Sequence, residues 1–294
     1  MFGCSGSGRG LAGGGCTVAT NVALRHGRSR GRLTARTADR HLLYSEAVQC
    51  AASEIKFLRR VYRKANGRLP LLLREDFCGT GLICAHWVKA GPANRAIGVD
   101  LDPEPLGWSR SHLLSRLTRS QRARVRLHRA DVLAVQTPPV DVIVALNFSF
   151  CVFKRRPLLL EYFRQCRDAL KAGGLLVLDI YGGPESHRPN KEKTRYQGFT
   201  YVWEQVRYNP ITSEALNHIH FAFPDGSRMM KAFTYDWRLW TLAELQEGLL
   251  EVGFRQARVY WEGATSEGTG NGIFRCRRQA EVEDAWVAYV VGFR

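Results

Sequence analysis

The residues best placed to do chemistry lie in the stretch LLLREDFCGTGL, which runs from Leu71 to Leu82. An apolar run ends there in two acids, Glu75 and Asp76, and then enters a turn that contains Gly79 and Gly81. Glycines let the backbone of such a turn approach a ligand closely, and nearby carboxylates attract a cationic group and repel an anionic one. No Gly-Lys-Ser/Thr follows, which excludes a P-loop for nucleotide phosphates. The turn therefore predicts a ligand that carries positive charge.

Carboxylates also end the two strands expected next along the chain. Asp100 lies at the end of RAIGVDLD (95–102), and Asp131 lies in VRLHRADV (125–132). A carboxylate at the end of the strand after a glycine turn can accept hydrogen bonds from both hydroxyls of a ribose. NAD(P) and S-adenosylmethionine both contain that ribose, but a dinucleotide needs its pyrophosphate at the helix N-terminus and a third glycine where Cys84 stands. The acids and Cys84 therefore favour S-adenosylmethionine.

Strands and helices are expected to alternate through the first two thirds of the chain. Near-continuous apolar runs predict buried parallel strands, and apolar residues three or four apart predict helices. The expected helices are 44–65, 82–89, the arginine-bearing segment after Ser109 and 156–174, and the expected strands are 69–73, 95–102, 125–132, 141–150 and 175–183. This order predicts an α/β, Rossmann-like fold with a mostly parallel sheet and helices on both faces.

After Gly183 the apolar runs give way to aromatic residues that alternate with polar ones. This alternation predicts an antiparallel insert over residues 184–240 that covers the substrate. A helix at 241–254, with Thr241 and Glu244 as a capping box, comes next. Two further strands, 256–263 and 285–293, bring the predicted sheet to seven strands. Residues 39–294 are therefore expected to form one domain.

Several of these segments, taken in order, resemble the class I S-adenosylmethionine-dependent methyltransferases. They are LLLREDFCGTG (71–81), AIGVDLD (96–102), RADV (129–132), DVIVALNFSF (141–150) and LKAGGLLVLDIYG (170–182). The match runs over about residues 40–294, and YDWRLWTLAELQEGLLEVGF (235–254) resembles the segment that follows the core in small-molecule members. The resemblance implies the methyltransferase fold, S-adenosylmethionine as cofactor and methyl transfer as the activity.

The resemblance also implies roles for individual residues. The implied contacts are Glu75 and the turn Cys78, Gly79, Thr80 and Gly81 for the methionine end, Asp100 and Leu101 for the ribose, Asp131 and Val132 for the adenine, and Asn147 for the methyl group. The chain departs from the family pattern at Asp76, which replaces an apolar residue, and at Phe77, which replaces a glycine. A phenylalanine there is expected to keep a negative φ.

The acceptor is harder to predict, because methyl transfer from a sulfonium needs mainly alignment and exclusion of water. Candidates for a base or a positioning residue are Asn147, Tyr181, His218 and His220. The motif NFSF (147–150) lacks the prolines found where nucleic-acid bases are methylated, so a small molecule methylated at nitrogen or oxygen is favoured. The two histidines share a strand face, but a third ligand is not evident, and no metal site is predicted.

Two arginine-rich segments account for much of the net charge of +16. Residues 1–38 hold six arginines and no acid, a composition typical of an organelle transit peptide, which predicts a mitochondrial or plastid location. The alternative is a disordered leader on a cytoplasmic protein. Residues 110–129 hold seven arginines and no acid. The helical spacing of Arg116, Arg119, Arg122 and Arg126 predicts one solvated face, with RNA docking as the alternative.

Partners are predicted from what the sequence lacks. Eight cysteines without a CxxC pair indicate reduced thiols, and apolar runs too short to span a bilayer predict a soluble protein. The favoured function is therefore a small-molecule methyltransferase. The alternatives are an RNA or protein methyltransferase that docks through residues 110–129, and a non-catalytic methyltransferase-like binding protein. The sequence does not predict the oligomeric state.

Overall fold

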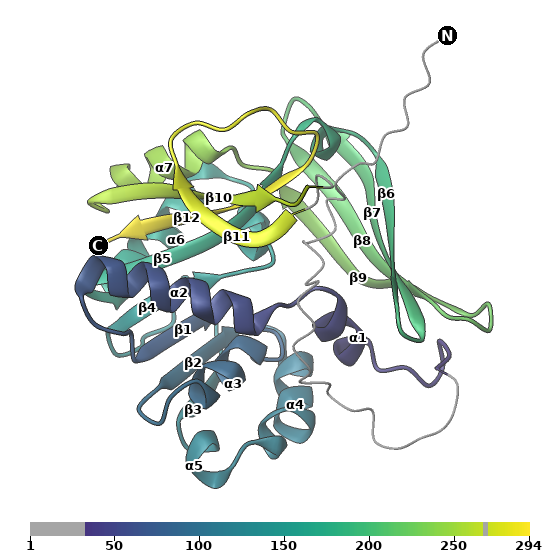
Figure 1. Ribbon diagram of the computed structural model, residues 1–294, viewed down its shortest axis with the longest axis horizontal. Coiled ribbons are helices and arrows are strands. Elements are labelled where there is room, and N and C mark those ends of the chain that lie inside the picture. Colours follow the sequence, from purple (N-terminus) through teal and green to yellow (C-terminus); the bar gives the residue numbers. More distant parts are fainter. Residues whose placement is uncertain (1–32, 267–269) are drawn as a thin grey trace. The chain divides into compact units, whose positions relative to one another are not determined.

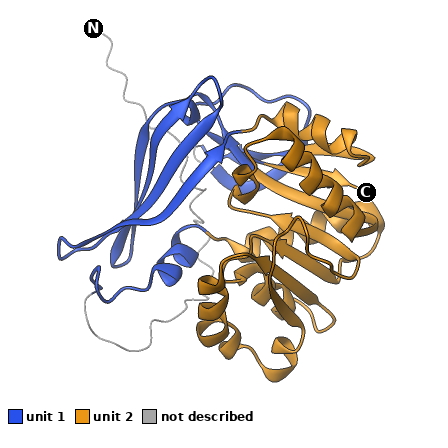
Figure 2. Ribbon diagram, turned by 180° about the vertical axis from the view of Figure 1, so that it is seen from behind, with its two compact units in different colours: residues 1–48, 180–239, 260–288 blue, residues 49–179, 240–259, 289–294 orange. Residues whose placement is uncertain are grey.

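The computed structural model describes residues 33–266 and 270–294, which fall into two compact units (Figure 2). One unit takes its described residues from 1–48, 180–239 and 260–288, and the other consists of 49–179, 240–259 and 289–294. Three strands, β5 (Leu170–Gly182), β10 (Gln256–Ala264) and β12 (Trp286–Phe293), run from one unit into the other. The predicted transit peptide lies mostly outside the described residues.

The large sheet has eight strands in the order β11-β10-β12-β5-β4-β1-β2-β3 (Figure 1). Its other strands are β1 (Leu72–Asp76), β2 (Arg95–Asp100), β3 (Val125–Arg129), β4 (Val140–Ala145) and β11 (Gly270–Arg277). The pairs β1–β2, β1–β4, β2–β3 and β4–β5 are parallel. This arrangement confirms the Rossmann-like fold. The eighth strand, β11, was not among the seven predicted strands, because its sequence has little apolar alternation.

The helices are α1 (Arg40–Ala47), α2 (Ala51–Asn66), α3 (Leu82–Lys89), α4 (Pro103–His112), α5 (Arg119–Arg122), α6 (Arg156–Ala169) and α7 (Leu242–Glu251). Thr241 and Glu244 form the predicted capping box of α7. The single helix expected over 44–65 is wrong, because Cys50, with φ −114° and ψ 50°, breaks it into α1 and α2. No helix in the described part of the chain is long and apolar enough to cross a membrane.

The arginine-rich segment is not one helix with one charged face. Arg116 ends a 3₁₀ turn, Arg119 and Arg122 lie in α5, and Arg126 lies in β3. Arg122 donates to the carbonyl oxygen of Leu117 at 3.2 Å. The segment therefore folds as a 3₁₀ turn, a short helix and a strand, and at least one of its arginines, Arg122, is bound to a backbone carbonyl and does not point freely into solvent. The predicted single solvated face is therefore wrong.

The insert forms a separate antiparallel sheet of four strands in the order β6-β7-β8-β9. These strands are β6 (Asn190–Tyr196), β7 (Phe199–Asn209), β8 (Glu214–Ala222) and β9 (Arg228–Arg238). The predicted meander is present, and β6 is an extra strand that its charged composition concealed. Successive residues of a strand point to opposite faces, so Tyr201 and Trp203 lie on one face while Val202 and Glu204 lie on the other.

Candidate functional site

The two acids before the glycine turn point to opposite sides of β1, as strand alternation requires. Asp76 is 1% exposed and is held by Arg74, whose Nε and Nη2 donate to its two carboxylate oxygens at 2.7 and 2.8 Å. The hydroxyl of Tyr162 donates to it as well, at 2.9 Å. Asp76 is therefore neutralised within the core. The expectation that it attracts a cationic ligand is wrong.

Glu75 faces the glycine turn and the start of α3. Its Oε2 accepts a hydrogen bond from the backbone N–H of Cys84 at 3.0 Å. Burial raises the pKa of Glu75 to about 7, against the lowering effect of the hydrogen bonds from Cys84. Because this carboxylate occupies one of the N–H donors that a phosphate would use at a helix N-terminus, the site disfavours a pyrophosphate.

The turn itself has three residues in the left-handed region, at Phe77 (φ 54°), Gly79 (φ 52°) and Gly81 (φ 70°). A Cβ on Gly79 would meet nothing within 4 Å, so open space lies directly beyond this backbone. The expected negative φ at Phe77 is wrong. Its ring lies 5.8 Å from the ring centroids of both Phe153 and Tyr162, and this packing accounts for a strained residue in the place of a glycine.

The end of β2 offers the acceptors that a ribose needs. Asp100 accepts the N–H of Gly79 at 2.7 Å on Oδ2 and the N–H of Asp102 at 2.9 Å on Oδ1. A carboxylate has about four acceptor positions, so two remain for ribose hydroxyls. The next residue, Leu101, is 63% exposed and presents an apolar surface suited to a ligand ring.

Beyond β3, Asp131 is exposed and Val132 is buried. Asp131 Oδ1 accepts the N–H of Leu133 at 2.9 Å, which fixes the turn and leaves Oδ2 available. Asp131 follows β3, the neighbour of β2 in the sheet, which agrees with the predicted adenine contact. That role stays a prediction.

Asp179, near the end of β5, was not predicted as a site residue. Its two carboxylate oxygens accept the N–H groups of Asn147 and Phe148, each at 2.8 Å. Both of those residues are in the left-handed region, with φ of 57° and 59°. Asp179 therefore holds the loop after β4 in a strained conformation. The signal in the sequence was one acid inside the apolar run LLVLDIY.

Glu54, in the first turn of α2, was also missed. Burial, followed by the charges of Asp179 and Glu75, raises the pKa of Glu54 to about 8. Its Oε2 is buried and has no hydrogen-bond partner among the described residues. A buried carboxylate oxygen without a partner calls for a ligand, water or proton. The detectable signal was an acid on the apolar stripe of α2 that Ala51, Leu58 and Val61 share.

These side chains fit S-adenosylmethionine better than a phosphate-bearing cofactor. Glu75, which is buried, and Glu54 and Asp179, which are half-buried, form an acidic cluster suited to a cationic ligand, and Asp100 retains free acceptor positions. The positions named from the resemblance at Cys78 and Thr80 are buried within the turn. Cys78 donates its N–H to the carbonyl of Val99 at 3.0 Å, so it joins the turn to β2.

In the other unit, Tyr181 joins a cluster of aromatic rings. Its ring centroid lies 6.4 Å from that of Trp203 and 6.5 Å from that of Trp237. Tyr235 stacks on Trp237 at 4.5 Å. Trp203 Nε1 is buried without a hydrogen-bond partner among the described residues, and so are both amide atoms of Asn217, which is fully buried. The aromatic face therefore contains hydrogen-bonding groups, the indole N–H of Trp203 and the amide of Asn217, that could bind a ligand.

His218 and His220 lie together, 5.8 Å between ring centroids, but on the opposite face of the insert sheet from Trp203. Burial, then the charge of Lys231, lowers the pKa of His218. His220 Nδ1 accepts the N–H of Lys231 at 2.8 Å, so its Nε2 carries the proton and donates to Glu204 at 2.8 Å. The structure therefore does not bring these histidines to Tyr181. No group of His, Cys, Asp and Glu in residues 33–266 and 270–294 is arranged to hold a metal.

Comparisons with known proteins agree with this geometry. Residues 78–176 match a family model described as a methyltransferase domain. A search of curated proteins found no match.

Solved structures are similar in fold over most of their length. The sugar N-methyltransferase KedS8 from Streptoalloteichus sp ATCC 53650 is 22% identical, with a TM-score of 0.57 over 90% of this chain and 95% of that one. CalS10, an amino pentose methyltransferase from Micromonospora echinaspora solved with S-adenosylmethionine bound, is 17% identical, with a TM-score of 0.58 over 85% of this chain and 95% of that one. An S-adenosylmethionine-dependent methyltransferase from Clostridium acetobutylicum ATCC 824 is 18% identical, with a TM-score of 0.59 over 84% and 95%. Residues 78–176 therefore match a methyltransferase domain, and the fold of the described chain is that of solved S-adenosylmethionine-dependent methyltransferases.

Proposed function

We propose that the protein transfers a methyl group from S-adenosylmethionine to the amine of a polar small molecule, with an amino sugar as the favoured class. The observation that carries the proposal is the aromatic face around Trp203, where a buried indole N–H and the buried amide of Asn217 have no partners among the described residues. Aromatic rings take the apolar face of a sugar, and an amide and an indole N–H can bond its hydroxyls.

Two structural neighbours support the amine as acceptor. KedS8 is described as a sugar N-methyltransferase and CalS10 as an amino pentose methyltransferase.

In the proposed reaction the cofactor supplies an electrophilic methyl group on a sulfonium. Glu75 and Glu54 bind and orient the cationic end of the cofactor, while Asp100 holds the ribose. Asp179 fixes Asn147 and Phe148, so that the loop after β4 keeps one conformation during alignment. Within the unit that contains the insert, the rings of Tyr181, Trp203 and Trp237 would keep water from an amine bound among them, since an exposed amine would stay solvated and react slowly.

A methyl-transfer assay with labelled S-adenosylmethionine and a panel of amino sugars tests the proposal. Trp203→Phe keeps an aromatic ring but removes the indole N–H together with the five-membered ring that carries it, and we expect it to raise KM several-fold with kcat less affected. Trp261→Phe, in the same unit but outside the aromatic cluster, is the matched control. The proposal fails if no amine is methylated, or if Trp203→Phe and the control behave alike.

Two other roles stay open to the same assay. Methylation at oxygen would appear with the corresponding alcohols in the panel. An RNA or protein acceptor would instead be labelled in a polymer, and a steep loss with salt would indicate docking through the exposed arginines of residues 110–129. The proposed mitochondrial or plastid location is tested separately, by imaging a fluorescent fusion with and without residues 1–38.

A further inference from the structure

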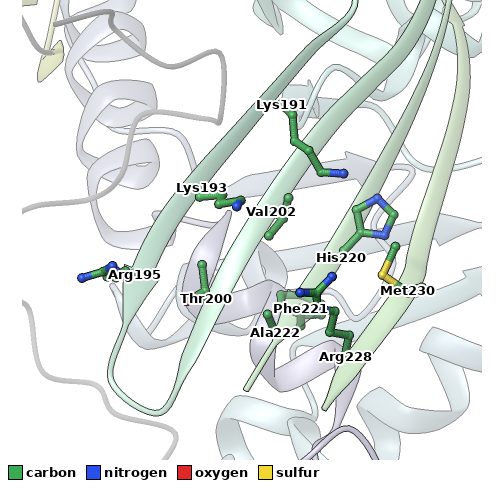
Figure 3. Close-up of a pocket in the computed structure, with 10 residues that line it drawn as sticks. All are labelled: Lys191, Lys193, Arg195, Thr200, Val202, His220, Phe221, Ala222, Arg228 and Met230. Carbon is green, nitrogen blue, oxygen red and sulfur yellow. The ribbon is translucent and has the colours of Figure 1, made fainter. Parts of the chain in front are cut away.

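The face of the insert sheet opposite the aromatic cluster contains a pocket of about 570 Å³ (Figure 3). Lys191, Lys193 and Arg195 come from β6, and Arg228 comes from β9, so the charged side chains stand on the two outer strands. The two strands between them contribute the floor, which includes Val202 and other small or apolar residues.

The strand register explains how the pocket is built. Arg195 pairs with Thr200, Thr200 with Ala222, and Ala222 with Arg228, so one row crosses all four strands with an arginine at each end. Three inter-strand spacings place the two arginine backbones about 14 Å apart. Because small residues lie between them, the long arginine side chains border an open trough.

The pocket has more positive than negative charge. Glu204 is the acid on this face beside the pocket, and it is already bound by Lys191 Nζ at 2.8 Å and by His220 Nε2 at 2.8 Å. Lys193, Arg195 and Arg228 make no ion pair with any described residue. Three exposed cations around one concave space therefore lack a counter-charge.

We propose that this pocket binds a phosphorylated small molecule. Guanidinium groups bind phosphate oxygens in a planar, bidentate geometry, and a volume of about 570 Å³ lies in the range of small-molecule sites. A single-stranded nucleic acid fits less well, because the large aromatic rings that would stack on bases lie mainly on the other face of the sheet. The site is also separate from the proposed amine site, which lies on that other face.

His220 and Glu204 set the charge at one side of this pocket. His220 binds the backbone N–H of Lys231 and the carboxylate of Glu204 at once, and so fixes both the irregular part of β9 and the acid. Glu204 in turn forms an ion pair with Lys191. Removing the carboxylate leaves Lys191 available and makes the pocket more positive, so Glu204→Gln is expected to strengthen phosphate binding.

Isothermal titration calorimetry of the full chain with inorganic pyrophosphate tests the proposal. We expect Lys193→Gln combined with Arg228→Gln to weaken binding at least about tenfold, and Glu204→Gln to strengthen it. Arg207→Gln, an exposed arginine of the same sheet outside the pocket, should bind pyrophosphate like the wild type. Thermal unfolding confirms that each variant is folded.

Three results would overturn the proposal. The first is no pyrophosphate binding, and the second is equal binding by the double variant and by Arg207→Gln; either would leave the cations of β6 only the role of preventing edge-to-edge strand pairing. The third is tight, steeply salt-dependent binding of a uridine dodecamer without binding of pyrophosphate, which would make the surface a nucleic-acid site.

Discussion

Asp179 should make the stability of the protein depend on pH in a way that a single substitution removes. Burial raises its pKa from 3.8 to about 7, against the lowering effect of the bonds from Phe148 and Asn147. Between these values the folded protein holds a proton that the unfolded chain has lost. Stability is therefore fully present below about pH 4 and falls as pH rises through 7. At about 1.4 kcal/mol per pKa unit, the loss is on the order of 4 kcal/mol.

Asp179→Asn should destabilise the protein at low pH and should no longer do so at high pH. At pH 5 the variant should be about 1–3 kcal/mol less stable than the wild type, because an amide accepts only one of the two N–H groups well. At pH 8.5 it should equal or exceed the wild type, because no buried charge forms. The pKa values of Glu54 and Glu75 are raised in the same direction, so the stability of Asp179→Asn still falls with pH, but less steeply than that of the wild type.

Urea unfolding followed by tryptophan fluorescence from pH 5 to 8.5 measures the effect. Asp168→Asn, an exposed acid on α6 whose side chain is 62% exposed, is the matched control and should follow the wild type throughout. Parallel curves for Asp179→Asn and the wild type would refute the reasoning, because they would show that Asp179 carries the same charge in both states.

Three further predictions concern the turn, the core and the arginine-rich segment. Phe77→Gly should be about 1 kcal/mol more stable than Phe77→Ala, measured by urea unfolding, because only glycine adopts φ near 54° without strain; equal stability would remove the strain argument. Arg74→Met should lose about 3–5 kcal/mol by leaving Asp76 buried and unpaired, and adding Asp76→Leu should recover most of that loss in the same assay. Changing Arg116, Arg119 and Arg126 together to Gln should leave the turnover of a small amine unchanged at about 50 and about 200 mM salt, a range over which binding to a polyanion weakens steeply. A large loss of turnover in this variant would point to an acceptor that docks on these arginines.

Much of the fold could be predicted because its parallel strands are continuous apolar runs separated by clear turn residues. The glycine turn and the Thr241 cap follow from local patterns, whereas the strand predicted at 69–73 is found at Leu72–Asp76, because its last three residues are charged and break the apolar run. The strand Asn190–Tyr196 could not be predicted, because a sheet edge exposed on one face has no apolar alternation to detect. The break at Cys50 was equally hidden, since the periodic pattern continues across it.

Parts of the candidate site were predictable where a residue type at the end of a strand has one well-known function in binding a ligand. Asp100 was placed at the end of the second strand in this way, and its contact with the ribose stays a prediction. The opposite environments of Glu75 and Asp76 were not predictable, because they depend on Arg74 and Tyr162, which approach only one side of β1. Glu54 and Asp179 depend on long-range burial, which no local pattern reports.

The central claim is that the end of β2 holds the ribose of S-adenosylmethionine, and calorimetry tests it most directly. Asp100→Ala should weaken binding of S-adenosylmethionine at least about tenfold, and Asp100→Asn, which keeps one acceptor oxygen, should weaken it less. Glu104→Gln, on the exposed first turn of the following helix, should bind like the wild type. If folded Asp100→Ala binds S-adenosylmethionine with unchanged affinity, the assignment of the cofactor site is wrong.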